Sequence, residues 1–367
     1  MEKINVTTKS SELQRILGKE LGKNINLARI KFICHFICSL CKVQTVNYEK
    51  LASGFDTSSK LESSIRRIQR FISGYPLDSS TIAKLIYRLL PKPKNGSFVL
   101  SIDRTNWKFG KFDINIFMLG IVYEAVAFPL LFTVLPKRGN SNTKERIALV
   151  ERYIKLFGKE TISCLVADRE FVGKAWISYL NDNNIQYNIR IRSNFEIFIP
   201  HKNKKVKAYW LFNTLKPLEY KYYSKIAKIK GVYCYISGCK THKTKNKQEY
   251  LIIISFSKPE KAQREYKKRW QIEMCFKAMK SSGFDIEKTH LQEIHRIEKL
   301  LLLVMISFVW CYKVGIYLHT MVKAIKIKSH GRKAKSIFKY GLTFISNCFL
   351  NAEARASFSI FKFLSCT

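Results

Sequence analysis

Apolar residues recur at helical spacing through the first part of the chain. A segment that begins at Ser11 predicts one helix, and residues 47–54 and 58–73 predict two more helices joined across a glycine turn. The Lys-Pro-Lys-Asn-Gly sequence at residues 92–96 then interrupts the helical pattern. The sequence therefore predicts an α-helical N-terminal domain over residues 1–95.

The predicted helix over residues 58–73 separates apolar from basic side chains. Its apolar stripe consists of Ile65, Ile68 and Ile72, and its basic side chains are Arg66, Arg67 and Arg70. Two helices joined by a turn can dock the second helix on DNA, so one interpretation makes these arginines DNA contacts. The other interpretation is a helix of a bundle whose arginine face is solvated.

From residue 98 the pattern changes to short apolar runs separated by helical segments. The predicted strands are residues 98–102, 114–124, 127–135, 162–167 and 187–192, and the predicted helices are residues 144–157 and 173–181. Three strands in succession, followed by alternation of helix and strand, predict a mixed α/β domain.

An aspartate follows each of two apolar runs that read as buried strands. Asp103 follows residues 98–102, and Asp168 follows residues 161–167. Open α/β sheets bind ligands beyond the carboxyl ends of their strands. A single aspartate in such a place is more often a turn or cap residue, but the pair makes a ligand-binding edge the stronger interpretation.

A third acidic residue lies on a predicted helix that starts near residue 259. Tyr266, Arg269, Glu273 and Lys280 are spaced by three, four and seven residues, which places them on one helical stripe about 60° wide. Glu273 can ligate a hard cation, and the two flanking cations can contact phosphate oxygens. The alternative is a solvated face joined by Arg269–Glu273 and Glu273–Lys277 pairs.

These three acidic segments together resemble the DDE-type insertion-sequence transposases that carry a Tyr-x2-Arg-x3-Glu-x6-Lys signature. The first block is Ser-Ile-Asp-Arg-Thr-Asn-Trp at residues 101–107, and the second is Ala-Asp-Arg-Glu-Phe at residues 167–171. The third block matches at all four signature positions, and the resemblance covers residues 97–290. Many members carry glycine where Glu170 stands.

The resemblance implies a site and an activity. Asp103, Asp168 and Glu273 would be the catalytic, metal-binding acids, and Tyr266, Arg269 and Lys280 would contact DNA near the cleaved phosphate. The acids would hold two Mg²⁺ ions about 4 Å apart, for which Mn²⁺ is expected to substitute. The enzyme would cleave double-stranded DNA at mobile-element ends and join those ends to target DNA, as a homodimer in the DNA complex.

Two other functions are compatible with the same residues. One is a nuclease of the same fold that hydrolyses DNA without strand transfer. The other is a non-catalytic DNA-binding protein derived from a transposase, although such a protein has no physical need for three convergent carboxylates.

The predicted fold is α/β, with a ribonuclease H-like catalytic core interrupted by a β-strand insertion. The order of predicted elements matches such a core, in which the third acid lies on a later helix. The expected domains after the first are the core over residues 96–196, the β insertion over 197–256, the second part of the core over 257–325, and a basic and apolar tail over 326–367. Within the insertion Trp210 could stack on a displaced base or be a buried strand aromatic, and residues 240–247 predict a lysine-rich hairpin.

Charge agrees with a nucleic-acid partner. The chain has 65 lysine and arginine residues against 27 acidic residues, a formal net charge of +38, and such a field attracts polyanions. A basic protein of the membrane surface is the alternative. Residues 300–312 form the most apolar stretch, which is shorter than the ~20 residues of a spanning helix, and no signal peptide is visible at residues 1–6. We expect no membrane association and a place in the bacterial cytosol, at the nucleoid.

Cysteines cluster near the N-terminus. Cys34, His35, Cys38 and Cys41 would suit a zinc site by residue type. The three cysteines fall at helical spacing, however, which favours small side chains on one buried helix face. The remaining cysteines are scattered, so no disulfide framework is indicated.

Overall fold

The computed structural model describes residues 6–109, 112–137, 139–241, 249–280, 283–329, 331–350 and 358–366. The chain forms two compact units. The first, called here the helical unit, comprises Met1–Pro91, Asn106–Asn115 and Cys275–Thr367, and the second, the sheet unit, comprises Lys92–Thr105 and Ile116–Met274. The chain passes between the units several times, so neither unit is one continuous stretch.

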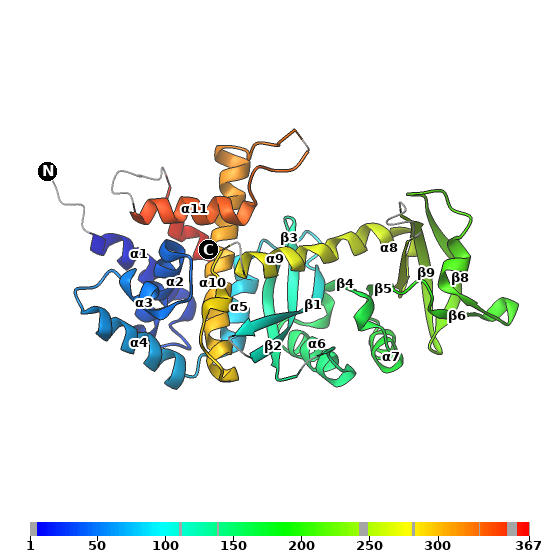
Figure 1. Ribbon diagram of the computed structural model, residues 1–367, viewed down its shortest axis with the longest axis horizontal. Helices are drawn as coiled ribbons and strands as arrows, with labels where there is room; N and C mark the ends of the chain where they lie inside the picture. The colour runs from blue at the N-terminus through cyan, green and yellow to red at the C-terminus, as the bar shows by residue number, and fades with distance from the viewer. Residues whose placement is uncertain are drawn as a thin grey trace. The chain divides into compact units, whose positions relative to one another are not determined.

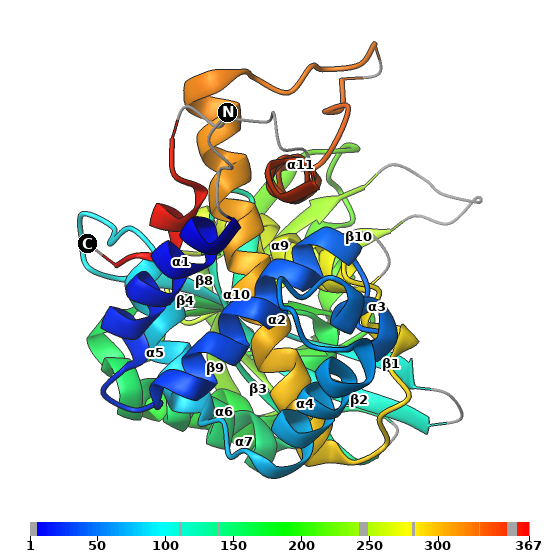
Figure 2. The same ribbon diagram turned by 90° about the vertical axis from the view of Figure 1, so that its left-hand side faces the viewer.

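Helices dominate the helical unit (Figures 1 and 2). They are α1 (Val6–Leu21), α2 (Leu27–Val43), α3 (Tyr48–Ser53), α4 (Leu61–Gly74), α5 (Ser79–Leu89), α10 (Ile294–Tyr317) and α11 (Ile337–Leu350). A π-helical turn (Leu318–Val322) follows α10, and a 3₁₀ helix (Ile360–Leu364) lies near the C-terminus. Side chains of Asn26, Asn47 and Asp78 cap α2, α3 and α5 by accepting bonds from backbone N–H groups. The helices predicted in the N-terminal part of the sequence are therefore present in the structure.

Helix α10 is the central apolar helix of this unit. It contacts α2, α4, α5 and α11, which lie around it in Figure 2. By length and composition the stretch Ile294–Val322 could cross a membrane, with a mean hydropathy of 2.0, but 83% of its most apolar window is buried by the protein itself. The helix is 24 residues long, so the expectation that this apolar segment is too short to span a membrane was wrong. The apolar helix can accommodate Lys299 and Lys313 because their ammonium groups donate hydrogen bonds to the backbone carbonyls of Ser73 and Leu89, at 2.9 and 2.7 Å.

The cysteines of α2 are buried thiols. Cys34, Cys38 and Cys41 all lie inside the helical unit, and the Sγ of Cys41 is 3.6 Å from the Sγ of Cys311. Burial raises the pKa of the Cys34 thiol to about 12. Neutral thiols of this kind pack as small apolar side chains.

The sheet unit is built on one sheet with the strand order β3-β2-β1-β4-β5-β10-β9-β8-β6-β7. The strands are β1 (Phe98–Phe109), β2 (Phe112–Tyr123), β3 (Val126–Leu135), β4 (Ile162–Ala167), β5 (Tyr187–Ile191), β6 (Glu196–Ile199), β7 (Lys204–Lys207), β8 (Tyr220–Ile229), β9 (Val232–Lys240) and β10 (Tyr250–Ser255). β1, β4 and β5 pair in parallel, and β10 pairs antiparallel with both β5 and β9.

Helices cover both faces of this sheet. α6 (Thr143–Phe157) and α7 (Lys174–Asp182) lie on one face, and α8 (Pro259–Tyr266) lies on the other (Figure 1). A capping box begins α6, in which the Asn142 side chain and the Glu145 side chain each bond the backbone of the other residue. The predicted helices at 144–157 and 173–181 match α6 and α7 closely.

The structure differs from the sequence prediction at three places in this unit. β1 continues past residue 102 to Phe109, so Asp103 lies within a strand and not at its end. The strands β6, β7 and β8 were not predicted. The helix expected from residue 259 is not uniform, because α8 ends at Tyr266, a 3₁₀ turn spans Lys267–Arg269, and α9 (Trp270–Met279) follows. The tip of the lysine-rich hairpin, at residues 242–248, lies outside the described residues.

Candidate active site

Two of the predicted acids occupy neighbouring positions across the sheet. Ile102 of β1 pairs with Ala167 of β4 in parallel register. Asp103 and Asp168 are the next residues along each strand. Since parallel strands carry their carboxyl ends to the same edge, the register brings together two acids that are 65 positions apart in the sequence.

The segment from α8 to α9 packs against this edge through a buried tyrosine. Tyr266 is fully buried and forms a cluster with Ala262 of α8 and Ile253 of β10. Its hydroxyl donates a hydrogen bond to the Oδ1 of Asp168 at 3.2 Å. On β1, the hydroxyl of Ser101 donates to the backbone carbonyl of Arg269 at 3.5 Å. The apolar contact and these bonds fix the segment beside the two aspartates.

Arg269 joins the third acid to the first. Its Nη1 donates to the Oδ2 of Asp103 at 3.1 Å, and its Nη2 donates to the Oε1 of Glu273 at 2.7 Å. The arginine side chain is 3% exposed, against 13% for Asp103 and 43% for Glu273. Asp103, Asp168 and Glu273 thus gather around two side chains of the signature, Tyr266 and Arg269.

Burial dominates the electrostatics of Asp103. It raises the pKa of this carboxyl to about 7, while the Arg269 guanidinium and a bond from the backbone N–H of Arg104 oppose the rise. The negative charges of Glu170 and Glu273 add to the rise. A carboxylate in such surroundings needs a neighbouring cation to remain ionised, and Arg269 supplies one.

The donor groups suit a hard divalent cation, although no complete cage is formed. Asp103, Asp168 and Glu273 offer the carboxylate oxygens that Mg²⁺ prefers. Among the described residues, no three acidic, histidine or cysteine side chains are arranged as a metal-binding group. The guanidinium of Arg269 lies between two of the carboxylates. The three acids therefore fit a divalent cation. In this structure the guanidinium of Arg269 is the positive group paired with Asp103 and Glu273.

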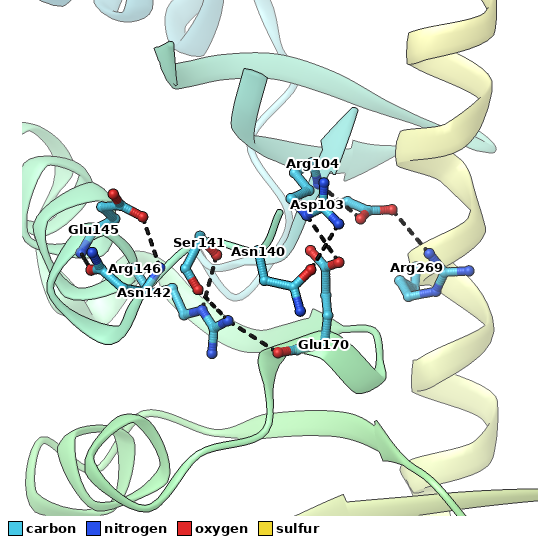
Figure 3. Close-up of polar contacts among 9 residues, drawn as sticks. All are labelled: Asp103, Arg104, Asn140, Ser141, Asn142, Glu145, Arg146, Glu170 and Arg269. Carbon is cyan, nitrogen blue, oxygen red and sulfur yellow. Dashed lines mark hydrogen bonds and ion pairs between the residues drawn. The ribbon is translucent and has the colours of Figure 1, made fainter. Parts of the chain in front are cut away.

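A second ion-pair network joins β1 to the turn after β4 (Figure 3). The Nε of Arg104 donates to the Oε2 of Glu170 at 3.0 Å, and its Nη2 donates to Asn140 at 2.8 Å. Arg146 of α6 donates to the Glu170 carbonyl at 3.0 Å and to Ser141. This network ties the turn after Asp168 to the strand that carries Asp103.

Sequence reasoning did not identify Arg104 or Arg146. The available signal was Glu170, which departs from the glycine common in the resembled family, and the arginine directly after Asp103. A glutamate two residues after one acid and an arginine one residue after the other are placed to pair when the acids are adjacent.

The other predicted residues lie elsewhere. Lys280 belongs to the helical unit, where its Nζ pairs with Glu287 at 2.9 Å. Trp210 lies in a 3₁₀ helix (Ala208–Phe212) and is 58% exposed, so the interpretation as a buried strand aromatic was wrong. On α4, Ile68 and Ile72 are buried, and the basic residues are exposed; these are Arg66, Arg67 and Arg70.

A mixed α/β sheet that brings one aspartate on a strand, one directly after a neighbouring strand and a glutamate on a later helix close together is the arrangement expected of a DDE-type transposase. The family described as "Transposase DDE domain" matches residues 95–310, more than half of the chain. No curated protein matches the chain. The chain therefore belongs to the transposase DDE domain family, an enzyme class whose membership implies DNA as the partner.

Proposed function

We propose that this protein is a catalytically competent transposase that cleaves DNA at the ends of a mobile element and joins those ends to target DNA. The observation that carries the proposal is the convergence of Asp103, Asp168 and Glu273 around Arg269 and Tyr266. A structural protein gains nothing from burying a carboxyl whose pKa is raised to about 7 beside two further acids, because each added charge costs stability.

The sheet supports a ribonuclease H-like core for this activity. The five strands β3-β2-β1-β4-β5, with β1, β4 and β5 parallel, follow the order expected of that fold. The first acid then lies on β1, the second after β4 and the third on the later helix α9. We propose that β6 to β9 are the β insertion of this core.

The three acids would hold two Mg²⁺ ions, with Mn²⁺ as a substitute. When bound, the ions would supply activation of a water or a 3′-hydroxyl and stabilisation of the leaving oxygen. Tyr266 holds the Asp168 carboxylate in a fixed orientation through its hydroxyl. Arg269 is bonded to Asp103 and Glu273 and limits the rise in the pKa of Asp103, and its guanidinium can contact a DNA phosphate when a metal takes its place.

Other residues would hold the DNA. We assign phosphate contacts near the cleaved bond to Tyr266, Arg269 and Lys280. The exposed indole of Trp210 can stack on a displaced base. The exposed arginines of α4 can contact DNA if α3 and α4 act as a helix-turn-helix. A homodimer would hold two element ends in the complex, in the bacterial cytosol at the nucleoid.

A joining assay tests the proposal. Purified protein is incubated with Mg²⁺, a pre-cleaved duplex of the sequence that flanks the gene, and a supercoiled target plasmid. We expect the duplex end to become covalently joined to the plasmid, and Asp168→Asn to abolish joining while still binding the duplex. Cutting without joining would indicate a nuclease, and binding without either reaction would indicate a non-catalytic DNA-binding protein.

A further inference from the structure

A third strand extends the row of charged residues at the candidate site. Ala167 of β4 pairs in parallel with Ile189 of β5, just as it pairs with Ile102 of β1. The next residue on β5 is Arg190. Asp103, Asp168 and Arg190 therefore occupy equivalent positions on or directly after three adjacent strands. Two acidic residues are followed across the sheet by a basic one.

The side chain of Arg190 lies on the α8 face of the sheet. Arg190 pairs with Ile253 of β10, and directly paired residues carry their side chains on the same face. Ile253 contacts Tyr266 and Ala262 on the α8 side. Burial raises the pKa of the Tyr266 phenol, and the positive charges of Arg269 and Arg190 oppose that rise. Arg190 thus lies within electrostatic reach of the residue that bonds Asp168.

The guanidinium of Arg190 has no partner of its own within the part of the chain that the structure describes. Its Nε is buried without a hydrogen-bond partner, and no carboxylate among the described residues forms an ion pair with it. Leaving a buried donor unsatisfied costs about 1–3 kcal/mol. The neighbouring arginine, Arg269, is by contrast paired with two carboxylates. An arginine that is half-buried and unpaired, one strand from the Asp168 position and close to Tyr266, indicates an anionic ligand from outside the protein.

We propose that Arg190 binds a backbone phosphate of the DNA strand that enters the candidate site, a contact outside the Tyr-Arg-Glu-Lys signature. The inference rests on the proposed function, since a DNA strand must reach the acids. A guanidinium presents planar N–H donors that match a phosphate in two parallel bonds. Arg190 would also offset the negative charge that phosphate brings to the acidic edge of the sheet.

Binding of the flanking-sequence duplex by matched variants tests this contact. Arg190→Gln keeps much of the side chain and removes its charge, and Arg190→Lys keeps the charge. The control is Lys155→Gln, which removes an exposed cation from α6 on the opposite face. We expect Arg190→Gln to weaken binding about tenfold and to reduce the log–log salt slope by about 0.9. Arg190→Lys should retain most of the affinity, and the control should bind as wild type.

Neutral phosphates separate a direct contact from a structural effect. Single methylphosphonates are placed in turn along the duplex end, each of which removes one phosphate charge. At one position the wild type should lose about tenfold in affinity while Arg190→Gln loses nothing further, because the contact is already absent. Equal losses in both proteins at every position would overturn the inference, as would wild-type affinity and salt slope in Arg190→Gln.

The two proposals fail in different ways. If wild-type protein neither binds nor cuts the duplex, the proposed function is wrong and the Arg190 contact falls with it. If wild type joins the end, Asp168→Asn does not, and Arg190→Gln binds as wild type at every methylphosphonate, only the Arg190 contact is wrong. Thermal unfolding of each variant confirms that the protein tested is folded.

Discussion

Buried cations are satisfied in two different ways in the two units. In the helical unit, Lys299 and Lys313 donate to the backbone carbonyls of Ser73 and Leu89. In the sheet unit, Arg269 donates to the carboxylates of Asp103 and Glu273. A carbonyl is a fixed part of the fold, whereas a carboxylate can exchange one cation for another. The lysine–carbonyl bonds stabilise the packing of α10 in the helical unit. The arginine–carboxylate bonds leave a site that a metal or a phosphate can enter.

The pKa values of Lys313 and Asp103 differ between the two units in the same way. Among the described residues no carboxylate pairs with Lys313, and burial lowers the pKa of its ammonium to about 8. For Asp103, burial raises the pKa to about 7, and Arg269 opposes that rise. The helical unit thus tolerates a cation that loses its charge easily, while in the site the Arg269 guanidinium keeps the pKa of Asp103 from rising further.

The largest expected effect comes from removing the charge of the acids. Asp103→Asn, Asp168→Asn and Glu273→Gln keep side-chain size and lose the oxygen charge that binds a cation. Each should reduce DNA cleavage by about 10³-fold or more, because metal-assisted charge stabilisation contributes several kcal/mol. Gel-based cleavage and binding assays on the same preparations measure this. Near-normal cleavage by any one variant would remove that residue from the site.

Removing the guanidinium tests whether the site cation can be exchanged. Arg269→Gln should lower the free energy of unfolding by about 1–3 kcal/mol, since it leaves the largely buried carboxyl of Asp103 without its partner. Millimolar Mg²⁺ should stabilise this variant more than wild type, because no side chain competes for the carboxylates. Urea unfolding with and without Mg²⁺ measures both effects.

The matched control is Lys268→Gln, the neighbouring cation, whose partner Glu265 lies outside the candidate site. It should respond to Mg²⁺ as wild type does. An equal Mg²⁺ response in Arg269→Gln and wild type would mean that the guanidinium and the metal do not share their ligands.

The Arg104–Glu170 pair should contribute a smaller amount. Both side chains are mostly buried, at 16% and 19% exposed, so their coupling should exceed that of a surface pair, at about 1–2 kcal/mol. A double-mutant cycle of Arg104→Gln and Glu170→Gln, followed by urea unfolding, gives the coupling free energy. A coupling free energy near zero would show that the Arg104–Glu170 pair does not hold β1 and the turn after β4 together.

A further effect is a pH dependence from Lys313. Its pKa falls from 10.5 in the unfolded chain to about 8 in the folded protein, so between these values the unfolded state binds more protons. The free energy of unfolding should therefore rise with pH from about 8 to 10.5, as linkage requires. Below that window Lys313 is charged in both states, and this contribution is absent.

Comparison with Lys313→Met isolates the contribution of Lys313 to the pH dependence of the free energy of unfolding. The variant should lack the part of the rise that wild type shows in that pH window, as measured by urea unfolding at a series of pH values. The same pH dependence in both proteins would assign the rise to another group.

The sequence predicted the elements whose pattern is unambiguous. β4 and β5 are apolar runs with buried side chains, so Asp168 could be placed after a strand. β8 (Tyr220–Ile229) was missed because its exposed and buried positions follow no regular alternation. The apolar stretch was ended at residue 312, before Lys313, because the sequence does not show that the ammonium of Lys313 is satisfied by a carbonyl 224 positions away in the chain.

The candidate site was predictable as a set of residues and not as a set of contacts. The acids could be named because each stands in a recognisable block. The bond from Tyr266 to Asp168 and the bridge from Arg269 to Asp103 span 98 and 166 positions, and they depend on strand register and on the 3₁₀ turn at Lys267–Arg269. Neither feature leaves a local trace in the sequence, so Arg190 also could not be found there.

Iron-directed cleavage of the protein backbone tests the central claim most directly. Fe²⁺ bound in place of Mg²⁺ reduces added hydrogen peroxide to hydroxyl radicals, which cut the chain close to the ion, and added ascorbate returns the iron to Fe²⁺. We predict cuts near Asp103, Asp168 and Glu273 together, suppressed by excess Mg²⁺ and lost in Asp168→Asn. Cuts at only one of these positions, or cuts that persist unchanged in Asp168→Asn, would contradict a shared cation site formed by the three acids.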